Sequence, residues 1–110
     1  MDIRVKGYLD RAENELVLAK ANFELSTKQK VKNVLNIPLT RTFFNNVISE
    51  GDYAIFYSAK AFLISMNIKT EPPEEHKKTY NELKKIVESK QLDNNWQKFM
   101  MKNQTRLKHF

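Results

Sequence analysis

The chain has 110 residues with a formal net charge of +6, and it contains two glycines, three prolines and no cysteine. This length predicts one domain, and the scarcity of turn-forming residues disfavours sandwiches and barrels. Without cysteine, a disulfide framework or a thiolate metal site is excluded. Hydrophobic residues make up 41% and charged residues 29%, a balance typical of globular chains and not of disordered ones.

The N-terminal sequence MDIRVKGYLDRAENE has no apolar signal core, so we expect no secretion and a cytoplasmic location. No apolar run reaches the roughly 20 residues that a membrane span needs, so we expect no membrane association. The sequence pI is near 9.6. This basic balance favours a polyanionic partner such as RNA, or an acidic protein, although a lysine-rich solubilising surface explains it equally well.

The first predicted helix is amphipathic and covers residues 2–25. Its apolar residues recur at alternating spacings of four and three, at Val5, Leu9, Ala12, Leu16, Ala19 and Phe23. This near-heptad pattern is typical of shallow-angle packing in a helical bundle. Residues 26–42 either extend this helix or form a short helix of their own, and Pro38 prevents helix at the residue before it.

The second predicted helix runs from about residue 41 to residue 67, with Thr40 or Thr42 as its N-cap. Between positions 53 and 66 its only polar residues are Ser58, Lys60 and Ser65. A helix that is apolar almost all round is buried on several sides, so we expect this one at the centre of the bundle. Gly51 indicates a kink or a close helix approach, and Asn67 suits a left-handed cap.

A third helix is predicted after Pro72 and Pro73, which are tolerated in a first helical turn. Its expected inner face consists of His76, Tyr80, Leu83, Ile86 and Val87. A fourth helix is predicted to begin at Asp93 as N-cap, with loosely spaced apolar residues at Trp96, Phe99, Met100, Leu107 and Phe110.

Few chemical motifs are present. His76 and His109 lack a glutamate three residues before them, which excludes the di-iron bundle pattern, and two isolated glycines cannot form a phosphate loop. Lys60 stands alone in the most apolar helix, where a lysine usually extends its amine to the bundle edge and otherwise contacts a phosphate or carboxylate. We expect Tyr57 and Tyr80 at the core edge, with base stacking as the alternative.

Three segments of the chain resemble the HEPN domain, in particular that of small archaeal and bacterial HEPN proteins. They are the N-terminal helix YLDRAENELVLAKANFEL and the later segments YAIFYSAKAFLISMNIKT and PPEEHKKTYNELKKIV. The resemblance covers about residues 8–90. It implies one domain over residues 1–110 with an altered or cut C-terminal part, folded as an all-α, up-and-down bundle of four to five helices. It also implies a homodimer, and a nucleotidyltransferase partner in a toxin–antitoxin-like pair.

Many HEPN proteins are metal-independent ribonucleases that use an arginine followed four to six residues later by a histidine. This chain departs from that pattern, since positions 70–72 before His76 are Thr, Glu and Pro, and Arg106 is too close to His109. We therefore expect a non-catalytic or weakly catalytic binding protein without metal or cofactor. Its expected nucleotide- or RNA-binding residues are Lys60, Tyr57, His76, Lys77 and Tyr80. The alternatives are a ribonuclease toxin with a degenerate site at His76 or His109, and a plain helical interaction module.

Overall fold

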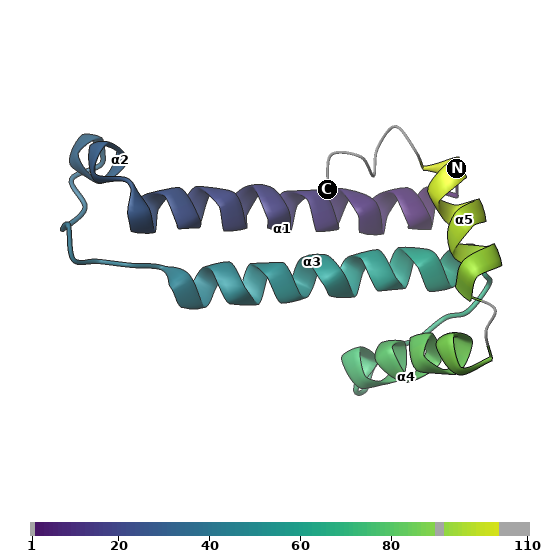
Figure 1. Ribbon diagram of the computed structural model, residues 1–110. Helices are drawn as coiled ribbons and strands as arrows, with labels where there is room; N and C mark the ends of the chain where they lie inside the picture. The colour runs from purple at the N-terminus through teal and green to yellow at the C-terminus, as the bar shows by residue number, and fades with distance from the viewer. Residues whose placement is uncertain (1, 90–91, 104–110) are drawn as a thin grey trace.

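The computed structural model describes residues 2–89 and 92–103 of the chain. Within these ranges it contains five α-helices and no strand (Figure 1). The helices are α1 (Ile3–Thr27), α2 (Gln29–Val34), α3 (Phe44–Ser65), α4 (Glu75–Glu88) and α5 (Leu92–Lys102). This confirms the predicted all-α bundle of four to five helices. None of these helices is long and apolar enough to cross a membrane.

The two longest helices, α1 and α3, lie antiparallel beside each other along most of their lengths (Figure 1). Small side chains are buried on both helices: Ala12 on α1 and Ala61 on α3 are fully covered, and Ala54 on α3 is 4% exposed. Alanine is a strong helix former, and its size allows two helix backbones to approach closely. The predicted seam of α1 is buried at Val5 and Leu9, but its far end at Phe23 is 52% exposed.

The start of α1 is capped by Asp2, whose Oδ1 accepts a hydrogen bond of 2.7 Å from the backbone N–H of Arg4. Hydrogen bonds from the Arg4 side chain and backbone lower the pKa of Asp2 to about 2. A lowered carboxyl pKa contributes stability above its ordinary value of 3.8, and this contribution is lost as the pH falls toward 2.

Residues 26 and 27 end α1, and the rest of the 26–42 segment forms the short helix α2 and a loop, so the prediction of a separate short helix is the correct one. Lys32 holds the loop, because its buried Nζ donates to the carbonyl oxygens of Leu39 at 2.8 Å and Arg41 at 2.6 Å. Asn36 has a φ of 57°, a left-handed conformation that asparagine tolerates better than most residues. The chain thereby turns back toward α1 before α3 begins.

The cap of α3 comes from another helix, so the prediction of Thr40 or Thr42 as N-cap is wrong. Phe43 occupies the N-cap position without a side-chain cap of its own, and its backbone N–H donates to Ser26 Oγ at 2.7 Å. The Ser26 hydroxyl in turn donates to the Asn22 carbonyl at 2.7 Å. Sequence reasoning considers caps close in the chain, whereas this acceptor is supplied by the end of α1.

The α3–α4 linker runs from the end of α3 back along that helix, so that α4 begins beside Phe56, in the middle of α3 (Figure 1). Asn67 takes the predicted left-handed conformation, with φ 62°. The predicted inner face of α4 is partly wrong: Ile86 is buried and Leu83 half-buried, but His76, Tyr80 and Val87 are exposed. Thr79 is fully buried instead, because its hydroxyl has a hydrogen-bonding partner inside the bundle.

Helix α5 begins one residue before Asp93, so Asp93 falls in its first turn and not at the predicted cap. Phe99 is buried as expected, whereas Trp96 is 43% exposed. Leu107 and Phe110, also predicted on this helix, lie outside the described residues. The rings of Trp96 and Phe99 both pack on Phe62, with centroids 5.5 Å from it, which places α5 over the C-terminal end of α3.

The hydrophobic core therefore lies at one end of the α1–α3 pair. Its buried members are Val5, Leu9, Ala61, Phe62, Leu63, Ile64, Ile86 and Phe99. Among the described helices, α1 runs beside the N-terminal half of α3, and α4 reaches this half only where His76 contacts Tyr53 (Figure 1). The expectation that this helix is buried on several sides holds for its last two or three turns but is wrong for residues 44–55, where Ile48 and Ile55 are 63% and 61% exposed.

Gly51 sits mid-helix as predicted, but a Cβ placed there would meet nothing within 4 Å. No other part of the described chain approaches it closely, so the glycine is not required for packing within one copy.

The Ser26 cap is tested by the change Ser26→Ala. The variant leaves the Phe43 N–H without its acceptor in a part-buried place, so we expect the free energy of unfolding to fall by about 1–2 kcal/mol. The matched control is Thr27→Ala, because the Thr27 hydroxyl bonds only within α1, to the Phe23 carbonyl. Urea denaturation of both variants measures the difference, and equal losses would contradict the interhelical cap.

Candidate functional site

The predicted ligand residue Lys60 lies inside the protein, with only 4% of its surface exposed. Its Nζ donates to the Thr70 carbonyl and to Thr70 Oγ1, the latter at 3.2 Å, and forms an ion pair with Glu75 at 3.7 Å. The Tyr8 ring lies 5.3 Å from the same nitrogen. An ammonium has three donors, of which Thr70 accepts two, and Glu75 balances the charge of the buried amine.

Thr70 extends this network to α4, since its hydroxyl lies 2.6 Å from that of the fully buried Thr79. The expectation that the Lys60 amine reaches the bundle edge is wrong. The amine instead ties α3, the α3–α4 linker and α4 together. A small hollow of about 220 Å³ beside it is lined by both basic residues, such as Arg4 and Lys69, and acidic ones, such as Glu71.

The other predicted residues meet in a group of stacked rings, which we call the aromatic face. It consists of Tyr8 on α1, Tyr53, Phe56 and Tyr57 on α3, and His76 and Tyr80 on α4. Tyr57 stacks between Tyr8 and Tyr53, with ring centroids 6.1 and 6.0 Å away. His76 lies flat on Phe56, at a centroid distance of 3.7 Å and an interplanar angle of 7°. The edge of His76 also meets Tyr53 at 5.6 Å, which joins the two helices.

Part of this face is open to solvent. Tyr53 is 43% and Tyr80 40% exposed, His76 is exposed, and Tyr57 is half-buried. Arg11 of α1 adds a cation, because its guanidinium carbon lies 5.2 Å from the Tyr8 ring centroid and 5.8 Å from that of Tyr57. Exposed ring faces beside an arginine suit stacking on a nucleobase together with contact to a phosphate.

Tyr80 contacts Phe56 edge-on, with ring centroids 6.4 Å apart. Partial burial raises the pKa of its hydroxyl, and the negative charge of Asp52 raises it further. The hydroxyl therefore stays protonated at neutral pH and is available as a hydrogen-bond donor. Lys77 is exposed next to His76 on α4, so it adds a cation beside the aromatic face.

The sequence identified three members of the aromatic face, Tyr57, His76 and Tyr80. It also predicted Lys60 as a ligand-binding residue, but the Lys60 side chain is buried in the protein interior. It missed Arg11 and Tyr8. Their spacing of three on one helix was a visible signal. That α1 lies against Tyr57 follows only from the fold. His109, a weak catalytic candidate, lies outside the described residues.

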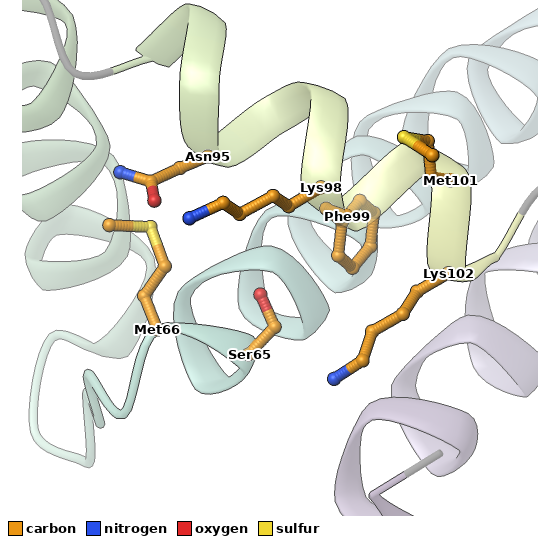
Figure 2. A pocket seen from close by; sticks show the side chains of 7 residues that line it. All are labelled: Ser65, Met66, Asn95, Lys98, Phe99, Met101 and Lys102. Carbon is orange, nitrogen blue, oxygen red and sulfur yellow. The ribbon is translucent and has the colours of Figure 1, made fainter.

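Another hollow, of about 550 Å³, lies between the end of α3 and α5 and is lined by two lysines (Figure 2). Its lining residues are Ser65, Met66, Asn95, Lys98, Phe99, Met101 and Lys102. Figure 2 shows the two lysine side chains extending from α5 on either side of Phe99. The Ser65 hydroxyl already donates to the Phe62 carbonyl at 2.5 Å, so it is not a free nucleophile. The hollow offers charge and apolar surface, without a group suited to acid–base chemistry.

No metal centre is evident in residues 2–89 and 92–103, where no three histidine, aspartate or glutamate side chains form a group that would hold an ion. Comparison of the chain with protein-family models, with curated proteins and with solved structures gave no match.

The role of Lys60 is tested by the change Lys60→Met, which keeps the length of the side chain and removes its charge. The Thr70 carbonyl and the partly exposed Glu75 lose their partner, so we expect unfolding to become easier by about 2 kcal/mol. Lys77→Met is the matched control, because Lys77 is exposed on the adjacent helix. If urea denaturation gives the same small loss for both, the amine does not hold the linker.

Proposed function

We propose that this chain is a HEPN-type helical protein that partners a nucleotidyltransferase in a cytoplasmic, toxin–antitoxin-like pair, and binds a nucleotide or single-stranded RNA on its aromatic face. The family and its partner rest on the resemblance of YAIFYSAKAFLISMNIKT and PPEEHKKTYNELKKIV. The observation that supports binding is the convergence of Tyr57, His76 and Tyr80, from two helices, into one partly exposed stack beside Arg11.

The arrangement supports binding better than catalysis. His76 is stacked flat against Phe56, whereas the Arg11 guanidinium sits over the rings of Tyr8 and Tyr57. Base stacking on an aromatic ring contributes about 1–3 kcal/mol per base without sequence preference. The net charge of +6 adds long-range attraction for a polyanion.

RNA binding is tested with a fluorescently labelled single-stranded RNA and anisotropy at increasing salt. We expect Tyr53→Ala and Arg11→Ala each to weaken binding about tenfold, because one removes an exposed stacking surface and the other a cation. Lys20→Ala is the matched control for Arg11, since it removes an exposed charge from the same helix. Circular dichroism checks that each variant keeps its helical content.

Three results decide the outcome. No binding at low salt, or binding that Tyr53→Ala leaves unchanged, would contradict the aromatic face. RNA cleavage in metal-free buffer that is abolished by His76→Ala would favour the ribonuclease alternative instead. The pairing is tested by co-expression with a nucleotidyltransferase encoded next to this chain, where separate elution in size-exclusion chromatography would count against it.

A further inference from the structure

The end of the molecule opposite the hydrophobic core combines exposed aliphatic side chains with a concentration of positive charge. It consists of α2 and the loop into α3, residues 28–41, and we call it the basic tip (Figure 1). Positions 25–49 contain no aspartate or glutamate and four cations, Lys28, Lys30, Lys32 and Arg41, which is a net +4 out of the chain's +6. Most of the excess positive charge is therefore gathered at one end.

Three aliphatic side chains of the basic tip are exposed within a short stretch of chain. Val34 is 79%, Leu35 55% and Leu39 53% exposed. Together they offer on the order of 300 Å² of largely apolar surface, which is similar to the largest apolar patch on a typical monomer. Single exposed hydrophobic residues are ordinary, whereas a group of this size often marks a binding surface.

The loop that carries these side chains is held from the inside. The buried Lys32 amine donates to the carbonyl oxygens of Leu39 and Arg41. The backbone N–H of Ile37 donates to the Lys32 carbonyl at 2.8 Å, and that of Arg41 donates to the Pro38 carbonyl at 2.9 Å. The aliphatic side chains are thus displayed on a backbone that is already ordered, so little conformational entropy is lost when they bind.

The charges of the basic tip differ in how far they are neutralised. Lys28 forms an exposed ion pair with Glu24 at 3.3 Å, and the Lys32 amine is occupied by backbone carbonyls. Lys30 and Arg41 are exposed on either side of the aliphatic group in the sequence. These two side chains are therefore the cations best placed to meet an anionic ligand.

Among ligands that take both cations and aliphatic side chains, a lipid surface fits the basic tip best. RNA would find no aromatic ring among the three exposed side chains on which a base could stack. An acidic protein would need a cavity matched to a projecting end of the molecule (Figure 1). A fluid bilayer adapts to such an end, because it takes aliphatic side chains below its headgroups while lysine and arginine remain at the phosphates.

We propose that the basic tip binds the surface of an anionic lipid bilayer. Val34, Leu35 and Leu39 enter the boundary between headgroups and acyl chains, and Lys30 and Arg41 contact the lipid phosphates. Because the tip is one end of the α1–α3 pair, the helices then stand away from the membrane (Figure 1). The expectation of no membrane association rests on the lack of a spanning run, and surface binding needs no such run.

The basic tip is separate from the aromatic face. Lys28 follows Arg11 by 17 positions, which is about 25 Å along a helix at 1.5 Å per residue. The lipid-binding inference therefore does not rest on the proposed function, and either one fails without the other. Anisotropy with labelled RNA distinguishes them, since we expect Leu39→Gln to leave RNA binding unchanged.

The first test is co-sedimentation of the purified full chain with lipid vesicles. One set contains equal parts of phosphatidylglycerol and phosphatidylcholine, and the other contains phosphatidylcholine alone. We expect the chain to bind the anionic vesicles and not the neutral ones. Absence of binding to the anionic vesicles at low salt would overturn the proposal and leave the basic tip to an acidic protein.

Variants separate insertion from general attraction, because a net charge of +6 draws any face of the chain toward an anionic surface. Leu39→Gln keeps the charge and removes an inserted side chain, so we expect vesicle binding to weaken about tenfold. Ile3→Gln is its matched control, since Ile3 is 81% exposed at the other end of α1. Equal effects of these two variants would overturn the proposal, and circular dichroism checks that both keep their helical content.

The role of the cations is measured in the same assay. Lys30→Gln is expected to weaken vesicle binding about fivefold, as for the loss of one basic residue near an anionic membrane. Lys84→Gln is its control, because Lys84 is exposed on α4, away from the tip. If Lys30→Gln weakens binding while Leu39→Gln binds like wild type, the tip attracts polyanions in general and insertion into lipid is overturned.

An environment-sensitive dye reports which part of the molecule enters the bilayer, since the chain has no cysteine of its own. A dye on Leu39→Cys is expected to brighten and shift to the blue on anionic vesicles, because it passes from water into an apolar medium. A dye on Val17→Cys, in the middle of α1 and 68% exposed, is expected to stay unchanged. Equal brightening at both positions would show that the molecule lies flat and would overturn insertion by the tip.

Discussion

The contact between α1 and α3 is the constraint on which the rest of the structure depends. Buried alanines on both helices let the backbones approach, and this proximity sets Ser26 against the start of α3 and Asn22 against Glu50. The same contact brings Tyr8 and Arg11 beside Tyr57. The Ser26 cap of α3, the hydrophobic core and the aromatic face thus all depend on the packing of α1 against α3. Of the described helices after α3, α4 packs beside the middle and C-terminal part of α3, and α5 covers its C-terminal end.

Buried polar groups fix the connections between helices. Lys32 binds two loop carbonyls before α3, and Lys60 binds the linker before α4. A backbone carbonyl removed from water needs a donor, and a long side chain rooted in a helix supplies one without adding secondary structure. The chain has few glycines and prolines to form tight turns, and these two lysines instead fix the backbone of the connections between helices.

The fold class and most helix positions could be predicted from spacing and composition alone. The alternating steps of α1, the break near Pro38 and the left-handed Asn67 are local signals, and the structure contains all three. The α3 cap at Ser26, the burial of Thr79 and the inward Lys60 could not be predicted, because each depends on a partner distant in the chain. The candidate site divides in the same way between local and distant signals. Its aromatic residues Tyr57, His76 and Tyr80 could be identified from the sequence, whereas Arg11 lies beside them only because α1 packs against α3.

The uneven cover of α3 gives the two halves of one helix different local stability. Its C-terminal half packs against α1, α4 and α5, while its N-terminal half is held mainly by α1, through packing, the Ser26 cap and the Asn22–Glu50 hydrogen bond. Opening of the first turns therefore exposes little additional apolar surface, and costs much less free energy than opening of the last turns. Amide hydrogens should accordingly exchange along α3 in a gradient, fast near Phe44 and slow near Leu63. The N-terminal half of α3 is therefore the part of the helix that an additional packing partner would stabilise most.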